Sequence, residues 1–148
     1  MDKKKITTAL TTGLLAGYGG QSQFSSITRG SFELKSSHFE MGDIVYHDEW
    51  TNGGGQEIVK VGNDLFTRVY AGGVLGKSKD VIQKLIYFIQ NLTDQTRLFA
   101  DCESVDGDWT YHYKIIDSDS DITTGKETIK YKDTTVFVHV FVLSPISN

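Results

Sequence analysis

The stretch "GDIVYHDEW", Gly42 to Trp50, returns later in the chain as "GDWTYHYKI", Gly107 to Ile115. Both stretches contain the pattern Gly-Asp-x-x-Tyr-His. The surrounding sequence is not of low complexity, so a chance match over this length is a poor explanation. The recurrence indicates an internal repeat, and an internal repeat determines the architecture of the whole chain.

Further agreement follows downstream of both stretches. "GQEIVKVGNDLFTRVY", Gly55 to Tyr70, aligns without gaps with "GKETIKYKDTTVFVHV", Gly125 to Val140. Glu57 then corresponds to Glu127. In each segment, β-branched and aromatic runs flank a short polar centre, which is typical of a β-hairpin. The sequence therefore predicts the same hairpin twice.

The two copies differ in two respects. The loop before the second hairpin is longer, and the additional residues lie in "DSDSDITTG", Asp117 to Gly125. Insertions are tolerated best in exposed turns, so we expect a solvated turn there. The gapless alignment also places His139 opposite Val69, which is a mismatch.

Each copy is preceded by a predicted helix. "SKDVIQKLIYFIQNL" begins with Ser78 as a candidate N-cap and carries apolar residues at helical spacing. The first helix is predicted from Lys4 to about Gly17, with Asp2 as its cap. Its threonines and Gly13 make it the weaker helical pattern. Gly72 and Gly73 are interpreted as the point where the chain leaves the sheet for the second helix.

Short strands are predicted at "SFELK", from Ser31, and at "TRLFADC", from Thr96. Each half then comprises one helix and four strands. The sequence predicts a single α+β domain of two α-β4 repeats, about 1–73 and 74–148, in which two helices pack on a curved antiparallel sheet. Duplication further predicts pseudo-twofold symmetry, with corresponding residues facing each other across a groove.

Composition limits the classes of function. The chain has 148 residues, of which 39% are hydrophobic, and a formal net charge of −4. This is ordinary for a globular domain and argues against a nucleic-acid surface, which requires clustered Lys and Arg. The single cysteine, Cys102, excludes an intramolecular disulfide and fits a reducing compartment.

The N-terminal stretch "MDKKKITTALTTGLLAGYGG" has the order of charged, apolar and small residues found in secretory signals. Threonines dilute its apolar part, however, and its apolar residues follow one face of a helix. No segment is long and apolar enough to span a membrane. We therefore expect a cytoplasmic protein without membrane contact, and the composition allows a homodimer.

The motifs also resemble a bacterial domain family, domain of unknown function 5680, some of whose members follow a helix-turn-helix regulator. The family has a Tyr-x-Asp motif, a Gly-x-Glu-x-Val motif, an aromatic hairpin ending in Tyr-x-Gly and a second Gly-x-Glu-x-Ile motif. The matching residues are Tyr46, Asp48, Glu57, Val59, Tyr70, Gly72, Glu127 and Ile129. Phe66 and Val69 depart from the family pattern, as does "LTDQTRLF", where the family has Pro-Arg-Gly-Pro. The resemblance implies the fold and the candidate position Tyr70, but no chemistry.

Strand alternation selects the candidate ligand-binding residues. Tyr46 and Tyr111 head the more apolar faces of their strands, and Glu57 and Glu127 share faces with apolar neighbours. A carboxylate on such a face must be hydrogen-bonded, paired or protonated. If the two halves converge, these residues and Tyr70 form an aromatic pocket with acidic anchors, suited to a small amine, a cationic metabolite or a polar ring compound.

A structural interpretation stays open beside this one. Tyr46 and Tyr111 then belong to the core, and each glutamate accepts hydrogen bonds from a loop or pairs with an arginine, for which Arg68 and Arg97 are candidates. His47 and His112 are secondary candidates that lie among polar neighbours on the opposite faces of their strands.

No motif for a metal, a cofactor or a nucleophile is present: ligand spacing, phosphate-loop residues and a nucleophile elbow are all lacking. The first hypothesis is a small-molecule sensor or carrier domain without catalysis. One alternative is an interaction or inhibitor module that presents a sheet edge or the Thr51–Gly55 loop to a partner. Another is an enzyme that uses Glu57 or Glu127 as its acid or base.

Overall fold

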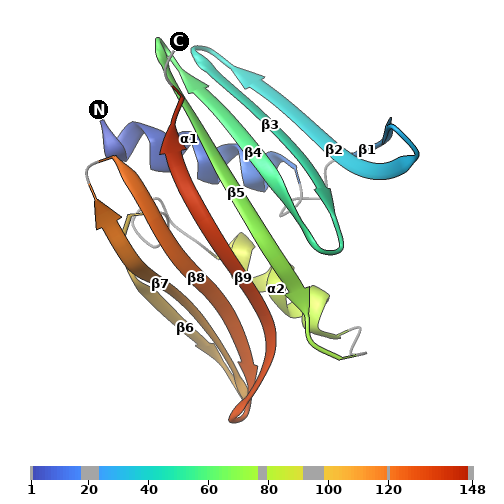
Figure 1. Cartoon of the computed structure of the whole chain (residues 1–148). Coiled ribbons are helices and arrows are strands. Elements are labelled where there is room, and N and C mark those ends of the chain that lie inside the picture. Colours follow the sequence, from blue (N-terminus) through green and yellow to red (C-terminus); the bar gives the residue numbers. More distant parts are fainter. Residues whose placement is uncertain (1, 18–23, 77–79, 92–98, 120, 147–148) are drawn as a thin grey trace.

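The computed structural model describes residues 2–17, 24–76, 80–91, 99–119 and 121–146. Two helices and nine strands are found there, and the protein is α+β (Figure 1). The elements are α1 (Lys3–Ala16), β1 (Ser25–Arg29), β2 (Phe32–Met41), β3 (Ile44–Thr51), β4 (Gly54–Val61), β5 (Asp64–Val74), α2 (Asp80–Gln90), β6 (Cys102–Asp106), β7 (Trp109–Asp119), β8 (Ile122–Tyr131) and β9 (Thr134–Pro145).

All nine strands form one antiparallel sheet in the order β1-β2-β3-β4-β5-β9-β8-β7-β6. The long strands β5 and β9 pair at its centre, where Tyr70 lies opposite Phe141. From this pair, β4, β3 and β2 follow on one side, and β8, β7 and β6 follow on the other. Strands from distant parts of the chain therefore meet at the β5–β9 junction, whereas all other neighbours are consecutive hairpins.

Both predicted hairpins are present, and their turns lie in the polar centres. Gly62 has φ 59° in the β4–β5 turn, and Lys132 has φ 55° in the β8–β9 turn. Two-residue hairpin turns of the favoured type require positive φ, which glycine adopts without steric cost. Lys132 is the only residue other than glycine with positive φ among those described.

The two helices cover the same face of the sheet, each over its own half (Figure 1). One core cluster joins α1 to β3, β4, β5 and the end of β9, and it includes Ile6, Leu10, Val59, Phe66 and Leu143. The other joins α2 to β7, β8 and β9, and it includes Leu85, Phe88, Ile89, Ile129, Phe137 and Phe141. Burial of these apolar side chains is the main favourable term that holds the layers together.

Helix α1 confirms its predicted cap and explains its glycine. The side chain of Asp2 accepts hydrogen bonds from the backbone of Lys4 and Lys5, at 3.1 and 3.3 Å. Gly13 lies directly against the ring of Tyr46, and a Cβ at this position would overlap that ring. The residue that weakens the helical pattern is thus the one that lets α1 approach β3.

The structure corrects several of the predicted strand bounds. The first half has an additional strand, β1, which pairs with β2 at the edge of the sheet, so it has five strands instead of four. Gly72 and Gly73 do not end the sheet, because β5 continues through them to Val74 and Gly72 pairs with His139. Ser78 lies outside the described residues, as do Thr96, Arg97 and Leu98 at the start of the predicted strand "TRLFADC". For Phe99 to Asp101 the strand prediction is wrong, because β6 begins only at Cys102.

Much of the "DSDSD" segment is also strand, because β7 continues to Asp119 and pairs with β8 after an irregularity between Ile115 and Asp117. The longer loop of the second copy therefore lengthens a hairpin, and its exposed end carries the added residues.

Candidate ligand-binding site

Two rows of inward-facing residues cross the sheet beneath the helices. The first row runs over β2, β3, β4 and β5 through neighbouring pairs, and it consists of Ser37, Asp48, Glu57 and Arg68. The second row runs over β6, β7, β8 and β9, and it consists of Cys102, Tyr113, Glu127 and His139. Side chains directly opposite one another on one face of a sheet are in contact range.

In the first row, both carboxylate oxygens of Glu57 accept hydrogen bonds. The hydroxyl of Tyr46 donates to Oε1 at 2.8 Å, and Nη1 of Arg68 donates to Oε2 at 2.7 Å. The side chains of Glu57 and Arg68 are each only 2% exposed, so this is a buried ion pair with short hydrogen bonds. Breaking such a pair at one partner is costly because the other charge stays buried.

In the second row, Glu127 is held by a tyrosine and more loosely by two basic groups. The hydroxyl of Tyr111 donates to its Oε1. Its Oε2 lies 3.4 Å from Nδ1 of His139 and 3.7 Å from Nη2 of Arg68. These last two distances exceed those of well-formed hydrogen bonds, so the attraction there is chiefly electrostatic.

Arg68 joins the two rows. Its Cζ lies over the rings of Tyr70 and Phe141, 5.1 and 4.9 Å from their centroids. Burial disfavours its charge, but the negative charge of Glu57 and its neighbours outweighs burial and holds the pKa of Arg68 well above its ordinary value. Arg68 is therefore a permanent cation between the two glutamates.

Asp48, the acidic member of the first row beside Glu57, is 2% exposed. The hydroxyl of Tyr70 donates to its two oxygens at 3.2 and 3.3 Å. Burial, and then the charge of Asp48, raise the pKa of Tyr70 far above its ordinary value. Burial, and then the charge of Glu57, do the same to the pKa of Tyr46. Both phenols consequently stay protonated and act as hydrogen-bond donors to carboxylates.

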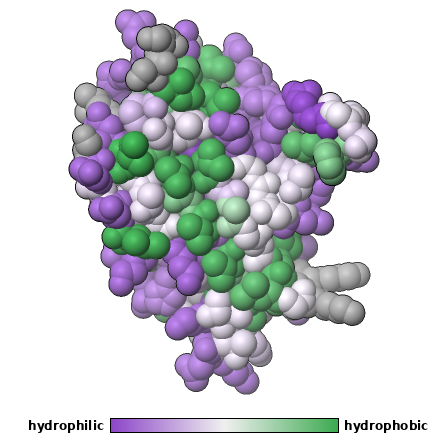
Figure 2. Space-filling model, viewed as in Figure 1, coloured by the Kyte–Doolittle hydropathy of each residue, from purple (hydrophilic) through white to green (hydrophobic). Residues whose placement is uncertain are grey.

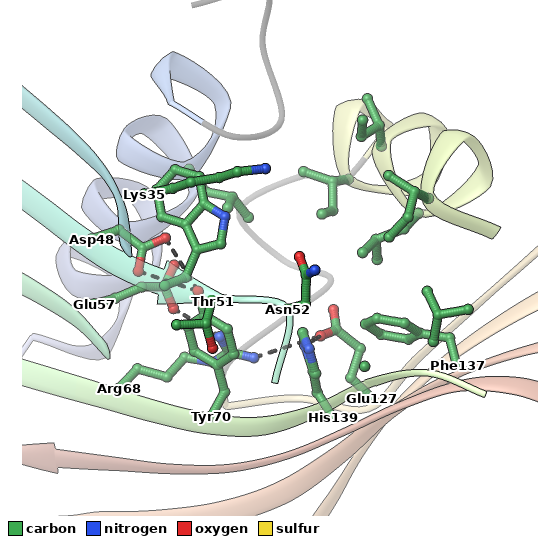
Figure 3. Close-up of a pocket in the computed structure, with 18 of the residues that line it drawn as sticks. Lys35, Asp48, Thr51, Asn52, Glu57, Arg68, Tyr70, Glu127, Phe137 and His139 are labelled. Carbon is green, nitrogen blue, oxygen red and sulfur yellow. Dashed lines mark hydrogen bonds and ion pairs between the residues drawn. The ribbon is translucent and has the colours of Figure 1, made fainter. Parts of the chain in front are cut away.

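A cavity of about 620 Å³ opens above these rows, between the sheet and the two helices (Figure 3). Asp48, Glu57, Arg68, Tyr70, Glu127 and His139 form its polar floor. Its apolar wall comes mainly from α2, with Ile82, Leu85, Ile86 and Ile89, and also from Leu14, Val74 and Phe137. Phe24, Lys35, Trp50, Thr51, Asn52 and Gly73 complete its lining.

The predicted candidates divide into three groups. Glu57, Glu127, Tyr70 and Arg68 line the cavity together. Tyr46 and Tyr111 are buried in the core and do not line it, but their hydroxyls bind the two glutamates. His47 and His112 lie on the outer face of the sheet, where they contact Glu49 and Glu103. Of the two arginines considered as glutamate partners, Arg68 takes that place, while Arg97 lies outside the described residues.

Two floor residues, Asp48 and His139, were not among the predicted candidates. Asp48 lies between Tyr46 and Trp50 on the inward face of β3, so strand alternation is the signal that identifies it. His139 is hidden by a register irregularity between Ile129 and Lys130. The gapless alignment pairs His139 with Val69, but in the sheet His139 lies opposite Glu127, as Arg68 lies opposite Glu57.

Comparison with protein-family models, with curated proteins and with solved structures finds no match. In the described part of the chain, no three His, Cys, Asp or Glu side chains are arranged to hold a metal ion. Neither helix there is long and apolar enough to cross a membrane.

Proposed function

We propose that this chain is a non-catalytic domain that binds a small organic molecule in the cavity, as a sensor or a carrier does. The observation that carries the proposal is the combination of a 620 Å³ hollow with buried charged groups on its floor. Ligand sites in proteins typically have volumes of about 300–1,000 Å³, mostly apolar walls and a few fixed polar groups. The cavity fits each of these criteria.

The floor is supported from below, which favours binding to a preformed site. Tyr46 and Tyr111 hold Glu57 and Glu127 from within the core, and the ring of Tyr111 is itself stacked on Phe88 of α2, with 5.5 Å between centroids. Side chains locked by such supporting contacts lose little conformational entropy when a ligand arrives.

The proposal includes the internal duplication predicted from the sequence, with its pseudo-twofold relation between the halves. In its support, the same order of hairpins leads outward from β5 and from β9, and a Tyr–Glu hydrogen bond occurs in each half. Superposition of 32–74 on 102–145 tests it. Matching backbone paths with Glu57 over Glu127 are expected, and unrelated paths would exclude duplication.

The binding function is tested by filling the apolar end of the cavity. In Ile86→Trp, an indole occupies space beside α2, and ligands that raise the thermal stability of the natural chain lose their effect. Gln83→Trp is the matched control, because Gln83 is exposed on the same helix and does not line the cavity. The measurement is a thermal-shift screen of both variants and the natural chain against a metabolite library.

The proposal fails if no compound shifts the natural chain, or if Ile86→Trp and Gln83→Trp respond alike. Variants Glu57→Gln and Glu127→Gln extend the screen to the floor. Loss of every ligand shift in these variants is expected, whereas unchanged shifts would exclude the two glutamates from the site.

A second candidate function, protein–protein interaction, has one observation in its favour. On the outer face of the sheet, Val69, Val140 and Val142 lie side by side on β5 and β9 and are 43–50% exposed. Figure 2 shows apolar side chains gathered over this face. Sedimentation of the natural chain and of Val140→Lys tests whether this patch joins two copies, since a dimer held there dissociates in the variant. Catalysis by Glu57 or Glu127 stays a sequence hypothesis.

A further inference from the structure

Two histidines meet on the outer face of the sheet, on the side away from the cavity. His38 of β2 and His47 of β3 are directly opposite each other in the β2–β3 hairpin, and their Nδ1 atoms lie 3.4 Å apart. Their ring centroids are 5.5 Å apart, and the ring planes are tilted by 56°. The two side chains are 52% and 36% exposed, so an ion can reach both from solvent.

Each histidine is oriented by a carboxylate of its own strand. Both strands carry the pattern His-x-Glu, as "HFE" from His38 and "HDE" from His47. Nε2 of His38 lies 2.9 Å from Oε1 of Glu40, and Nε2 of His47 lies 3.0 Å from Oε1 of Glu49. Arg29 also donates to Glu49, at 2.7 Å. An ionised carboxylate only accepts hydrogen bonds, so Nε2 is the donor in both His–Glu contacts.

These contacts decide which ring nitrogen carries the lone pair. A neutral imidazole has one N–H, and when the proton is on Nε2 the Nδ1 atom is an acceptor. Two such lone pairs 3.4 Å apart repel each other unless a cation lies between them. That cation is either a proton, which turns one ring into an imidazolium, or a metal ion that binds both Nδ1 atoms.

The distance between the rings favours the metal ion. N–H donors usually lie about 2.7–3.2 Å from their acceptors, which is shorter than the 3.4 Å observed here. In a tetrahedral zinc site, Zn–N distances of about 2.0–2.1 Å place two nitrogens about 3.3–3.4 Å apart. Histidines that bind a metal typically donate their other N–H to a carboxylate, as both of these do.

We propose that His38 and His47 bind a divalent late transition metal ion, such as Zn²⁺, through their Nδ1 atoms, with water completing the coordination. Imidazole nitrogens suit zinc, copper and nickel ions. Two protein ligands agree with the finding that no three metal-binding side chains gather in the described residues. The site has no sequence motif because its histidines are nine residues apart and meet only through strand pairing.

The second half of the sheet supplies a matched control. His112 occupies the place on β7 that His47 occupies on β3, but its cross-strand partner is Glu103 instead of a histidine. Nδ1 of His112 lies 3.0 Å from Oε2 of Glu103, so this nitrogen faces a carboxylate. A metal ion at His112 would therefore have one imidazole where the proposed site has two.

Isothermal titration of Zn²⁺ into the natural chain, without a histidine tag and at neutral pH, is expected to show a site for one ion. His38→Ala and His47→Ala should each lower the affinity at least about tenfold, since even changes to groups behind the ligands cost about 10–100-fold. His112→Ala should leave the affinity unchanged. Mg²⁺ should give no binding signal, because it prefers oxygen ligands.

Nitrogen NMR of the imidazole rings in the natural chain identifies the binding atoms without any variant. Zn²⁺ should shift the Nδ1 resonances of His38 and His47, while both Nε2 atoms keep their protons. If neither Nδ1 resonance responds, or if His38→Ala and His112→Ala bind Zn²⁺ equally well, the metal site is excluded and a proton is the cation between the rings. The cavity takes no part in this test, so its result is independent of the proposed function.

Discussion

The first and second rows occupy corresponding places on one sheet but treat their glutamates differently. Glu57 faces Arg68, a permanent cation, at hydrogen-bond distance and almost without exposure. Glu127 faces His139, which is partly exposed, at 3.4 Å. The first row thus contains a hydrogen-bonded ion pair, whereas the contacts of Glu127 with His139 and Arg68 in the second are longer. The difference shows that corresponding backbone positions need not carry equal roles, because the cross-strand partner of the glutamate is an arginine in one row and a histidine in the other.

The largest loss of unfolding free energy is expected when Arg68, the cation that lies between the two rows, is removed. Arg68→Met leaves Glu57 buried without its partner, and we expect a loss of about 3–5 kcal/mol in unfolding free energy. His139→Gln should cost less than about 1 kcal/mol, because its contact with Glu127 is long. Urea denaturation of both variants measures the contrast. Equal losses would show that the two rows do not differ as described.

The helices provide the next contrast, since α1 meets Tyr46 with a glycine while α2 stacks Phe88 on Tyr111. Gly13→Ala should destabilise the protein by about 1–3 kcal/mol through overlap with the Tyr46 ring. Helix propensity alone predicts the opposite, a gain of about 1 kcal/mol. Thermal and urea unfolding decide the sign, with Lys4→Ala at an exposed site of α1 as control. A more stable Gly13→Ala would mean that α1 is free to move away from β3.

Alkaline pH sharpens the comparison at the first row. Tyr46 has a raised pKa in the folded protein, so it keeps its proton when the unfolded chain loses it near its ordinary value of 10.0. Its contribution is complete below pH 10 and declines as pH rises further, by about 1.4 kcal/mol per pH unit. Tyr46→Phe should lower the slope of unfolding free energy against pH by that amount, while Tyr70, whose pKa is also raised, keeps its own contribution. An unchanged slope would show that Tyr46 is not the group responsible.

The smallest loss of unfolding free energy is expected for a substitution on the outer face of the sheet. There Glu49 contacts His47 at 3.0 Å and Arg29 at 2.7 Å. The hydrogen bond from His47, and then Arg29, lower the pKa of Glu49. A lowered pKa stabilises the fold above the unfolded value of 4.5, and this contribution is lost as pH falls through the folded value. Glu49→Gln should cost about 0.2–1 kcal/mol at neutral pH, decreasing with salt. A loss as large as that of Arg68→Met would remove the distinction between the two faces.

Much of the local structure was predictable. Strand alternation placed Tyr46, Glu57 and Glu127 on inward faces, and the polar centres located both hairpin turns. The Glu57–Arg68 pairing was also predictable, because a two-residue turn after Val61 sets the register of that hairpin. These features depend on residues close together in the chain, where backbone geometry leaves few alternatives.

The site itself was only partly predictable. Arg68 lies near Glu127 because β5 pairs with β9, and this pairing joins distant parts of the chain. His139 enters the floor through a register irregularity in β9 that the gapless alignment does not contain. The packing of α1 and α2 then decided that Tyr46 and Tyr111 are covered while Tyr70 borders the cavity.

By itself, the sequence determined which residues form the hairpins and helices and which face of each strand carries its glutamate, because these follow from side-chain periods of two and 3.6. Tertiary structure alone decided that the two glutamates share one arginine and that Asp48 and His139 join them under an apolar helix. The physical reason is that charge balance at a buried site depends on every group brought within a few ångströms, and only the packed chain defines that set.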